Sequence, residues 1–281
     1  MNNIQTTKNL RRFGRFFLFG FSFLFLLTSC EEPVTPIGGG DPGDTNIPNE
    51  RVILYAVGNS ENRQTLDTEA EWDALLDQLC DQAHAGNEVT FYNISQTTYL
   101  HGSAKGADKE SRTITTTSRE EIKDWMKTME KEGHTVKVTY DDNSGTWHGE
   151  AYATAPSNTT SGILIGSWHF NCMVVTQVDF NGNLLSSDLY APEEGGGTMY
   201  YTFTADGTVT LTMQGMNGTT VTDSSTWSLS EDGVLYSDLL PSGTYWNVNW
   251  ITDNTMILSS SSLGTEEGDL YYQLQFDAVT K

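Results

Sequence analysis

Residues 199–213, with the sequence MYYTFTADGTVTLTM, decide the fold of the C-terminal half of this chain. Large apolar side chains alternate with polar ones on both sides of the dipeptide Asp206-Gly207. Such alternation is typical of a strand with one buried face, and Asp-Gly is a frequent hairpin turn. The stretch therefore predicts an antiparallel hairpin whose apolar face is formed by Met199, Tyr201, Phe203, Val209, Leu211 and Met213.

The same pattern continues through residues 163–281. Turn dipeptides such as Asn181-Gly182, Asn217-Gly218 and Asp232-Gly233 punctuate the alternating segments. A spacing of roughly ten residues between turns predicts an antiparallel meander of about eight or nine strands, and no helical period appears. Such a sheet either packs on itself or closes into an up-and-down barrel, which removes its exposed edges.

Residues 51–156 alternate instead between strand-like and helix-like segments. Two helices are expected after the capping boxes that begin at Thr68 and Ser118. Strands are expected at residues 51–57, 88–94, 112–117, 135–140 and 146–154. This order, β-α-β-β-α-β-β, predicts an α+β domain of ferredoxin-like type, a split βαβ sandwich with an extra hairpin strand.

A long segment without a strong local pattern, residues 95–111, interrupts this domain. It contains Tyr99, His101, Lys105 and Lys109. Long loops in compact domains either carry function or are disordered. A hydrolase or peptidase-inhibitor-like module, with this loop at its site, is therefore the alternative function for the α+β domain.

Residues 1–29 have the composition of a signal peptide. A basic segment comes first, formed by Lys8, Arg11, Arg12 and Arg15. An apolar run of about a dozen residues follows, which is too short to span a membrane. The run ends in Leu27-Thr28-Ser29-Cys30 and resembles a bacterial lipoprotein signal, which implies cleavage before Cys30 and lipidation of its thiol. An ordinary secretory signal is the alternative.

Two segments of low apolar content separate the larger parts. Residues 30–50 are rich in Gly, Pro, Asp and Asn, so they predict a flexible acidic tether. Residues 157–162, SNTTSG, predict a linker between an α+β domain at 51–156 and a β domain at 163–281.

The charge of the chain is strongly negative. The 15 basic residues less the four in the signal leave 11 against 37 acidic residues, a net charge of −26 after cleavage. Nucleic acid is excluded as an expected partner, since phosphate neutralisation by basic residues supplies most of that affinity. The acidic excess favours solubility and repulsion at a crowded surface.

Several motifs of the β domain resemble a known family. They are Gly166-Ser167-Trp168, the stretch 201–209, Trp227-Ser228-Leu229, and Tyr271-Tyr272 followed by Phe276. Together they resemble the lipocalin-like domains of Bacteroidales surface lipoproteins. The resemblance implies a β-barrel that binds a small apolar ligand or serves as a surface interaction module.

The resemblance also implies a location. Glu31-Glu32 directly after Cys30 resembles the surface-export signal of Bacteroidales lipoproteins. We therefore expect a lipid-anchored protein of the outer membrane, exposed at the cell surface. The periplasmic leaflet is the alternative, and the membrane is the expected partner through Cys30.

No segment predicts catalytic residues, a metal or a cofactor. The chain has no Gly-x-Ser-x-Gly motif, and its five histidines lack zinc-ligand spacing. Asp141, Asn143 and Gly145 echo a calcium loop, but a turn between two strands explains them. Cys80 and Cys172 are expected to be buried thiols, Cys172 on the apolar face of its strand. We therefore expect a protein that is not an enzyme.

The interior of the predicted barrel is the remaining candidate site. Its aromatic residues either line a pocket for an apolar ligand or fill the space as a packed core. These residues are Trp168, Phe170, Tyr201, Phe203, Trp227, Trp246, Trp250 and Phe276.

Overall fold

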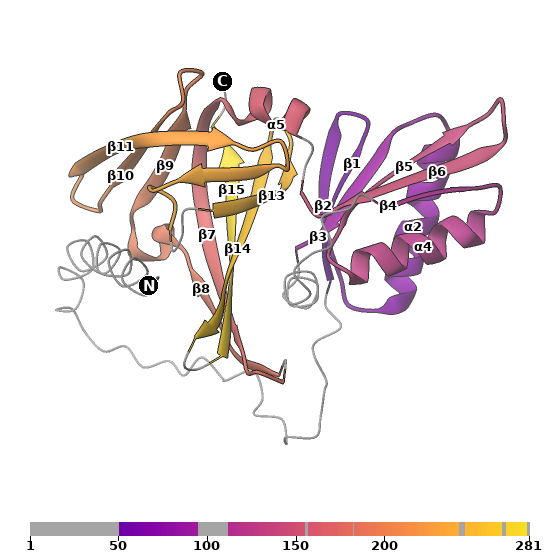
Figure 1. Ribbon diagram of the computed structural model, residues 1–281, viewed down its shortest axis with the longest axis horizontal. Helices are drawn as coiled ribbons and strands as arrows, with labels where there is room; N and C mark the ends of the chain where they lie inside the picture. Colours follow the sequence, from indigo (N-terminus) through magenta and orange to yellow (C-terminus); the bar gives the residue numbers. More distant parts are fainter. Residues whose placement is uncertain are drawn as a thin grey trace, which may run out of the picture.

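The structure is a computed structural model that describes residues 51–94, 112–154, 157–181, 183–241, 245–265 and 268–279. An α+β domain and a β-barrel lie side by side (Figure 1). The predictions for the signal peptide, Cys30, the tether and the loop at 95–111 fall outside the described residues.

The α+β domain is a six-stranded antiparallel sheet with two helices. Its strands run in the order β2-β1-β3-β5-β6-β4. The elements are β1 (Arg51–Val57), β2 (Ser60–Leu66), α2 (Glu69–His84), β3 (Val89–Asn93), β4 (Arg112–Thr116), α4 (Arg119–Lys131), β5 (Thr135–Asp141) and β6 (Thr146–Tyr152).

Both helices begin at the predicted caps. Thr68 Oγ1 accepts the backbone N–H of Glu71 at 3.2 Å, and the Glu71 carboxylate accepts the N–H of Thr68 at 3.0 Å, which completes the capping box. Ser118 caps α4 in the same way, but the Glu121 carboxylate accepts the Thr116 hydroxyl instead. The apolar stripes of both helices pack on the sheet, so the predicted helix faces are confirmed.

The ferredoxin-like arrangement is not confirmed. Strand β2 was not expected, because its sequence SENRQTL is polar and all but one of its residues are at least partly exposed. It forms at the edge of the sheet, where all seven residues pair with β1 after the turn at Gly58. The connection from β2 through α2 to β3 passes over β1, and that from β4 through α4 to β5 passes over β6. Each helical crossover therefore skips one strand, and the two halves of the sheet, β2-β1-β3 and β5-β6-β4, each contain one such crossover.

The second domain is a closed antiparallel barrel. Eight of its nine strands form the barrel, which pairing of β15 with β7 closes. The strands are β7 (Gly166–Val178), β8 (Leu184–Tyr190), β9 (Thr198–Phe203), β10 (Thr208–Gln214), β11 (Thr220–Leu229), β12 (Val234–Ser237), β13 (Tyr245–Ile251), β14 (Thr255–Thr265) and β15 (Gly268–Ala278). A short 3-10 helix, η1 (Pro192–Gly195), precedes β9.

Four strands continue past the rim of the barrel. β7 pairs with β9 at residues 166–169 and with β8 only farther along, at residues 173–178. β14 pairs with β13 no farther than Ser259, whereas its later residues pair with β15 alone. The strands β8-β7-β15-β14 thus form a protruding sheet (Figure 1). We call it the extension: residues 173–181, 183–190, 260–265 and 268–273.

The segment expected to be a linker is helical. Helix α5 (Ser157–Leu164) precedes the barrel. Thr160 and Leu164 are fully buried, and the Trp168 indole N–H donates to the carbonyl oxygen of Leu164 at 2.8 Å. Because Ile163 and Leu164 join the apolar core of the barrel, the segment is fixed there instead of forming an open connection.

The second face of the α+β sheet packs against the outside of the barrel. Leu54, Tyr92 and Ile94 of the sheet form an apolar cluster with Trp250 and Ile257 of the barrel, and all five are buried. Successive side chains of a strand point to opposite faces, so one face of β1 meets the helices and the other meets the barrel. The two domains therefore share a packed contact.

A β-bulge in β13 makes this contact. The register with β14 shifts between Val248 and Trp250, which leaves Asn249 as an extra residue. Thr135 Oγ1 donates to the carbonyl oxygen of Asn249 at 2.6 Å, and Asn249 Nδ2 donates to that of Ala153 at 3.0 Å. The extra residue reverses the alternation, so the prediction that Trp250 faces the barrel interior is wrong.

Candidate functional site

The interior of the barrel is occupied by side chains. Six of the predicted pocket residues are buried and belong to one apolar cluster: Trp168, Phe170, Tyr201, Phe203, Trp246 and Phe276. The rings of Phe170 and Phe276 lie 5.3 Å apart between centroids, and those of Tyr201 and Phe276 lie 5.6 Å apart at 86°. Such tilted and edge-on contacts are typical of a packed aromatic core. Ligand binding inside the barrel stays a prediction.

Polar atoms inside this core have partners. The Tyr201 hydroxyl donates to the carbonyl oxygen of Leu239 at 3.3 Å, and burial raises the pKa of Tyr201. The Trp227 indole N–H donates to the carbonyl oxygen of Thr204 at 3.0 Å, with its ring edge-on to Phe203. Trp227 is only half-buried, so it lies at one end of the cluster.

The two cysteines of the described chain lie apart. Cys80 is fully buried in α2, and this burial raises the pKa of its thiol to about 11. The prediction for Cys172 is wrong, because the register of β7 against β15 shifts between Phe170 and Cys172 and leaves Asn171 as an extra residue. Phe170 and Met173 face the core, so Cys172 points away from it and is half-buried.

The alternative site in the α+β domain, the loop at 95–111 with His101, lies outside the described residues. Among the residues that the structure does describe, no three His, Cys, Asp or Glu side chains are grouped to hold a metal ion. The Asp141 carboxylate accepts the hydroxyl of Ser144 at 2.8 Å and the N–H of Asn143 at 2.9 Å, and these bonds lower the pKa of Asp141. Its oxygens therefore hold the turn.

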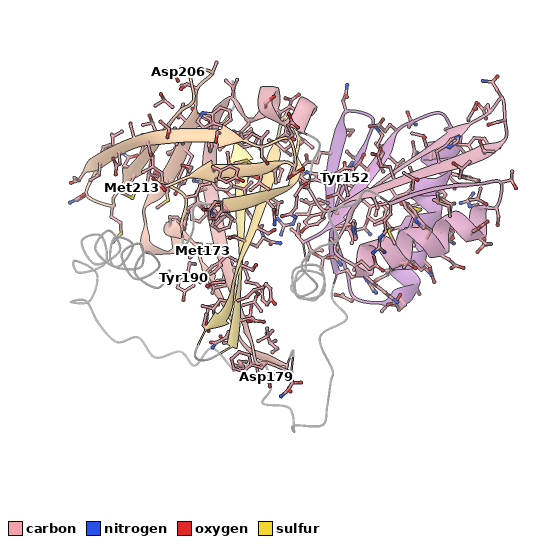
Figure 2. The ribbon with its side chains drawn as sticks, in the orientation of Figure 1. Tyr152, Met173, Asp179, Tyr190, Asp206 and Met213 are labelled. Atoms are coloured by element: carbon pink, nitrogen blue, oxygen red, sulfur yellow. The ribbon has the colours of Figure 1, made fainter. Side chains whose placement is uncertain are left out.

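The extension carries most of the large apolar side chains that are exposed in the described chain. Six of the ten large apolar side chains that are exposed there belong to it: Phe180, Leu184, Leu185, Leu189, Tyr190 and Leu263. Asp179 lies at the far end of the extension, whereas Tyr190 lies where β8 returns to the barrel (Figure 2). Four of the six, Leu184, Leu185, Leu189 and Tyr190, lie on the single strand β8, and exposed apolar groups that gather in this way mark interaction sites.

Strand β8 is also the edge of the sheet. It pairs with β7 alone, so within the described residues its outer N–H and C=O groups have no strand partner. Natural sheets protect such edges with lysine, proline, inward-pointing charges or bulges. The sequence of β8, LLSSDLY, has neither lysine nor proline and only one charge, at Asp188. Its pairing with β7 has a bulge at Leu185, whereas residues 186–190 pair regularly.

Sequence reasoning did not find β8. The signal was present, because Leu184, Leu185, Leu189 and Tyr190 supply the apolar content of a strand. The sequence does not show that these side chains are exposed, because exposure depends on how far β7 and β15 extend past the barrel.

Comparisons with known proteins give no further assignment: neither a protein-family model nor a curated protein matches the chain. The described helices include none that is long and apolar enough to cross a membrane.

Proposed function

We propose that the chain is a surface lipoprotein that uses its lipocalin-like barrel as a rigid scaffold and binds another protein through the edge of β8. The observation that carries the proposal is the apolar edge of the extension, which has neither lysine nor proline, with Leu185 54% and Leu189 56% exposed. The packed aromatic interior favours this use of the barrel over binding of a ligand inside it. No catalytic role is assigned.

Strand addition is the mode of binding that this edge fits. An extended segment of the partner lies beside β8, and its main-chain groups pair with the outer N–H and C=O groups of β8. Exposed apolar side chains on both faces of β8, such as Leu189 and Tyr190, then pack against those at successive positions of that segment. Because the mature chain carries a net charge of −26, from 11 basic and 37 acidic residues, basic residues flanking the segment favour association.

A photo-crosslinking experiment tests this surface. Tyr190 and Tyr245 are both exposed tyrosines, 44% and 63%, but only Tyr190 belongs to β8. A photoreactive phenylalanine analogue at position 190 is expected to give one discrete crosslinked product on intact cells. The same analogue at position 245 is the matched control and is expected to give none.

A second variant separates specific binding from chance contact. Leu185→Lys with Leu189→Lys introduces two charges on the β8 surface and is expected to abolish the product at position 190. The two leucines are exposed, so folding is expected to be unaffected, which thermal melting checks. Equal products from positions 190 and 245, or a product that survives both lysines, contradicts binding through β8.

The anchor is supported by the sequence Leu27-Thr28-Ser29-Cys30 and is tested separately. Two or three acyl chains hold a protein firmly, since each buried methylene contributes about 0.8 kcal/mol. Cys30→Ser is expected to move the protein from the membrane fraction to the soluble fraction after cell lysis. Retention of this variant in the membrane fraction would refute lipidation of Cys30.

A further inference from the structure

A hollow of about 330 Å³ lies where the two domains meet, away from β8. Ligand pockets span about 300–1,000 Å³ and occur preferentially at domain interfaces. The α+β domain contributes β1, β2 and the residue after β3, and the barrel contributes β7, β14 and β15. Neither domain alone forms this hollow.

The floor of the hollow is aliphatic. Leu54 and Ile94 come from the sheet and Ile257 from the barrel. All three belong to the buried cluster that joins the domains, with exposures of 2%, 6% and 1%. The floor is therefore part of a fixed contact and is present before any ligand arrives.

Three polar side chains on the wall have no partner within the described chain. Arg63 lies on β2 opposite Leu54, and Asp277 lies on β15 opposite His169 of β7. Asn171 is the extra residue of the bulge in β7, and such bulges often re-aim side chains at binding sites. By contrast, Glu61 on the same wall accepts the hydroxyl of Thr252, which joins the two domains.

We propose that this hollow binds a small zwitterion with an aliphatic side chain, namely a free amino acid or a dipeptide. The Arg63 guanidinium donates two parallel hydrogen bonds to the ligand carboxylate, because its planar N–H groups match the two carboxylate oxygens. The Asp277 carboxylate accepts from the ligand ammonium group, and Asn171 bonds to the remaining polar atoms. The aliphatic side chain of the ligand covers Leu54, Ile94 and Ile257.

The mixed charge of the wall selects this class. The wall carries one arginine, Arg63, and two carboxylates, Asp277 and Glu61, of which Glu61 already accepts the hydroxyl of Thr252. A ligand with both charges can pair with Arg63 and Asp277 at once, whereas a simple anion is repelled by the carboxylates and a simple cation is repelled by Arg63. The floor has no aromatic ring on which a planar ligand would stack. This inference is independent of binding through β8, and the two fail separately.

Isothermal titration calorimetry with L-leucine and L-leucyl-L-leucine tests the site on the mature chain. We expect saturable binding of at least one of them, and none of N-acetyl-L-leucine amide, which has the same side chain without charges. Arg63→Gln and Asp277→Asn are each expected to weaken binding by about tenfold or more, since charged hydrogen bonds are lost. Both positions are exposed, so the variants are expected to fold.

Two matched variants control for the change in charge alone. Lys131→Gln on α4 and Asp188→Asn on β8 lie outside the hollow and are expected to leave the affinity unchanged. The absence of binding by either zwitterion at millimolar concentration overturns the proposal. Binding that is equal in wild type, Arg63→Gln and Asp277→Asn also overturns it.

Discussion

Replacing Trp246 with alanine is expected to lower the free energy of unfolding of the barrel by about 3–5 kcal/mol. The side chain of Trp246 has no exposed surface and lies in the aromatic cluster of the barrel interior. Truncation removes the favourable transfer of the indole from water, and it also leaves a cavity that close-packed neighbours cannot fill. Urea unfolding followed by near-ultraviolet circular dichroism measures the change.

The neighbouring residue is the control for this variant. Tyr245 is 63% exposed, and its ring contacts only the ring of Tyr236 among the described aromatic pairs, at 5.3 Å. Tyr245→Ala is expected to cost less than about 1 kcal/mol, as is usual at surface positions. Similar losses for the two variants would mean that the interior around Trp246 is not closely packed.

Replacing Gly268 with alanine is expected to destabilise the extension by about 2–4 kcal/mol. Gly268 begins β15 with φ of 122°, a region that side chains disfavour. A Cβ atom there would lie 2.0 Å from the carbonyl oxygen of Val178 in β7. Because that oxygen belongs to the backbone, β7 and β15 must separate. Hydrogen exchange is expected to rise in the amides of β8 and the ends of β7 and β15.

Gly264 provides the matched control in the same hairpin. It also has a positive φ, 70°, but a Cβ atom there meets nothing within 4 Å. Gly264→Ala therefore introduces conformational strain alone, about 1 kcal/mol, without a clash. If the two variants exchange and melt alike, the close approach of β15 to Val178 does not hold the extension in place.

Where the strands are regular, the alternation of apolar and polar residues correctly predicted which side chains face the barrel interior. Val209 pairs with Phe203 and Met213 with Met199 around Asp206-Gly207, as the stretch 199–213 predicts. The same reasoning failed at Asn171 and Asn249, because a bulge adds one residue and reverses the alternation. Neither asparagine carries a local signal that marks a bulge, so the outward position of Trp250 follows only from the pairing of whole strands.

The candidate surfaces were harder to predict for a related reason. Strands β2 and β8 are edge strands whose sequences, SENRQTL and LLSSDLY, lack a clear alternation. The interdomain hollow joins residues far apart in the chain, such as Arg63 and Asp277. It depends on how the sheet of the α+β domain packs against the outside of the barrel. No local pattern encodes such a contact, whereas the helix caps at Thr68 and Ser118 are local and were predicted correctly.

If side chains fill the barrel interior, recognition takes place on the outside of the barrel. Binding of indole to the wild type and to Trp246→Ala tests whether the interior is filled. Trp246→Ala leaves a cavity shaped for an indole ring, and dry apolar cavities of this kind bind small aromatic molecules. Thermal melting with and without millimolar indole is expected to show a stabilised Trp246→Ala variant and an unchanged wild type. An equal rise in the melting temperature of the wild type would show that the interior already holds a ligand cavity, and it would contradict the packed scaffold.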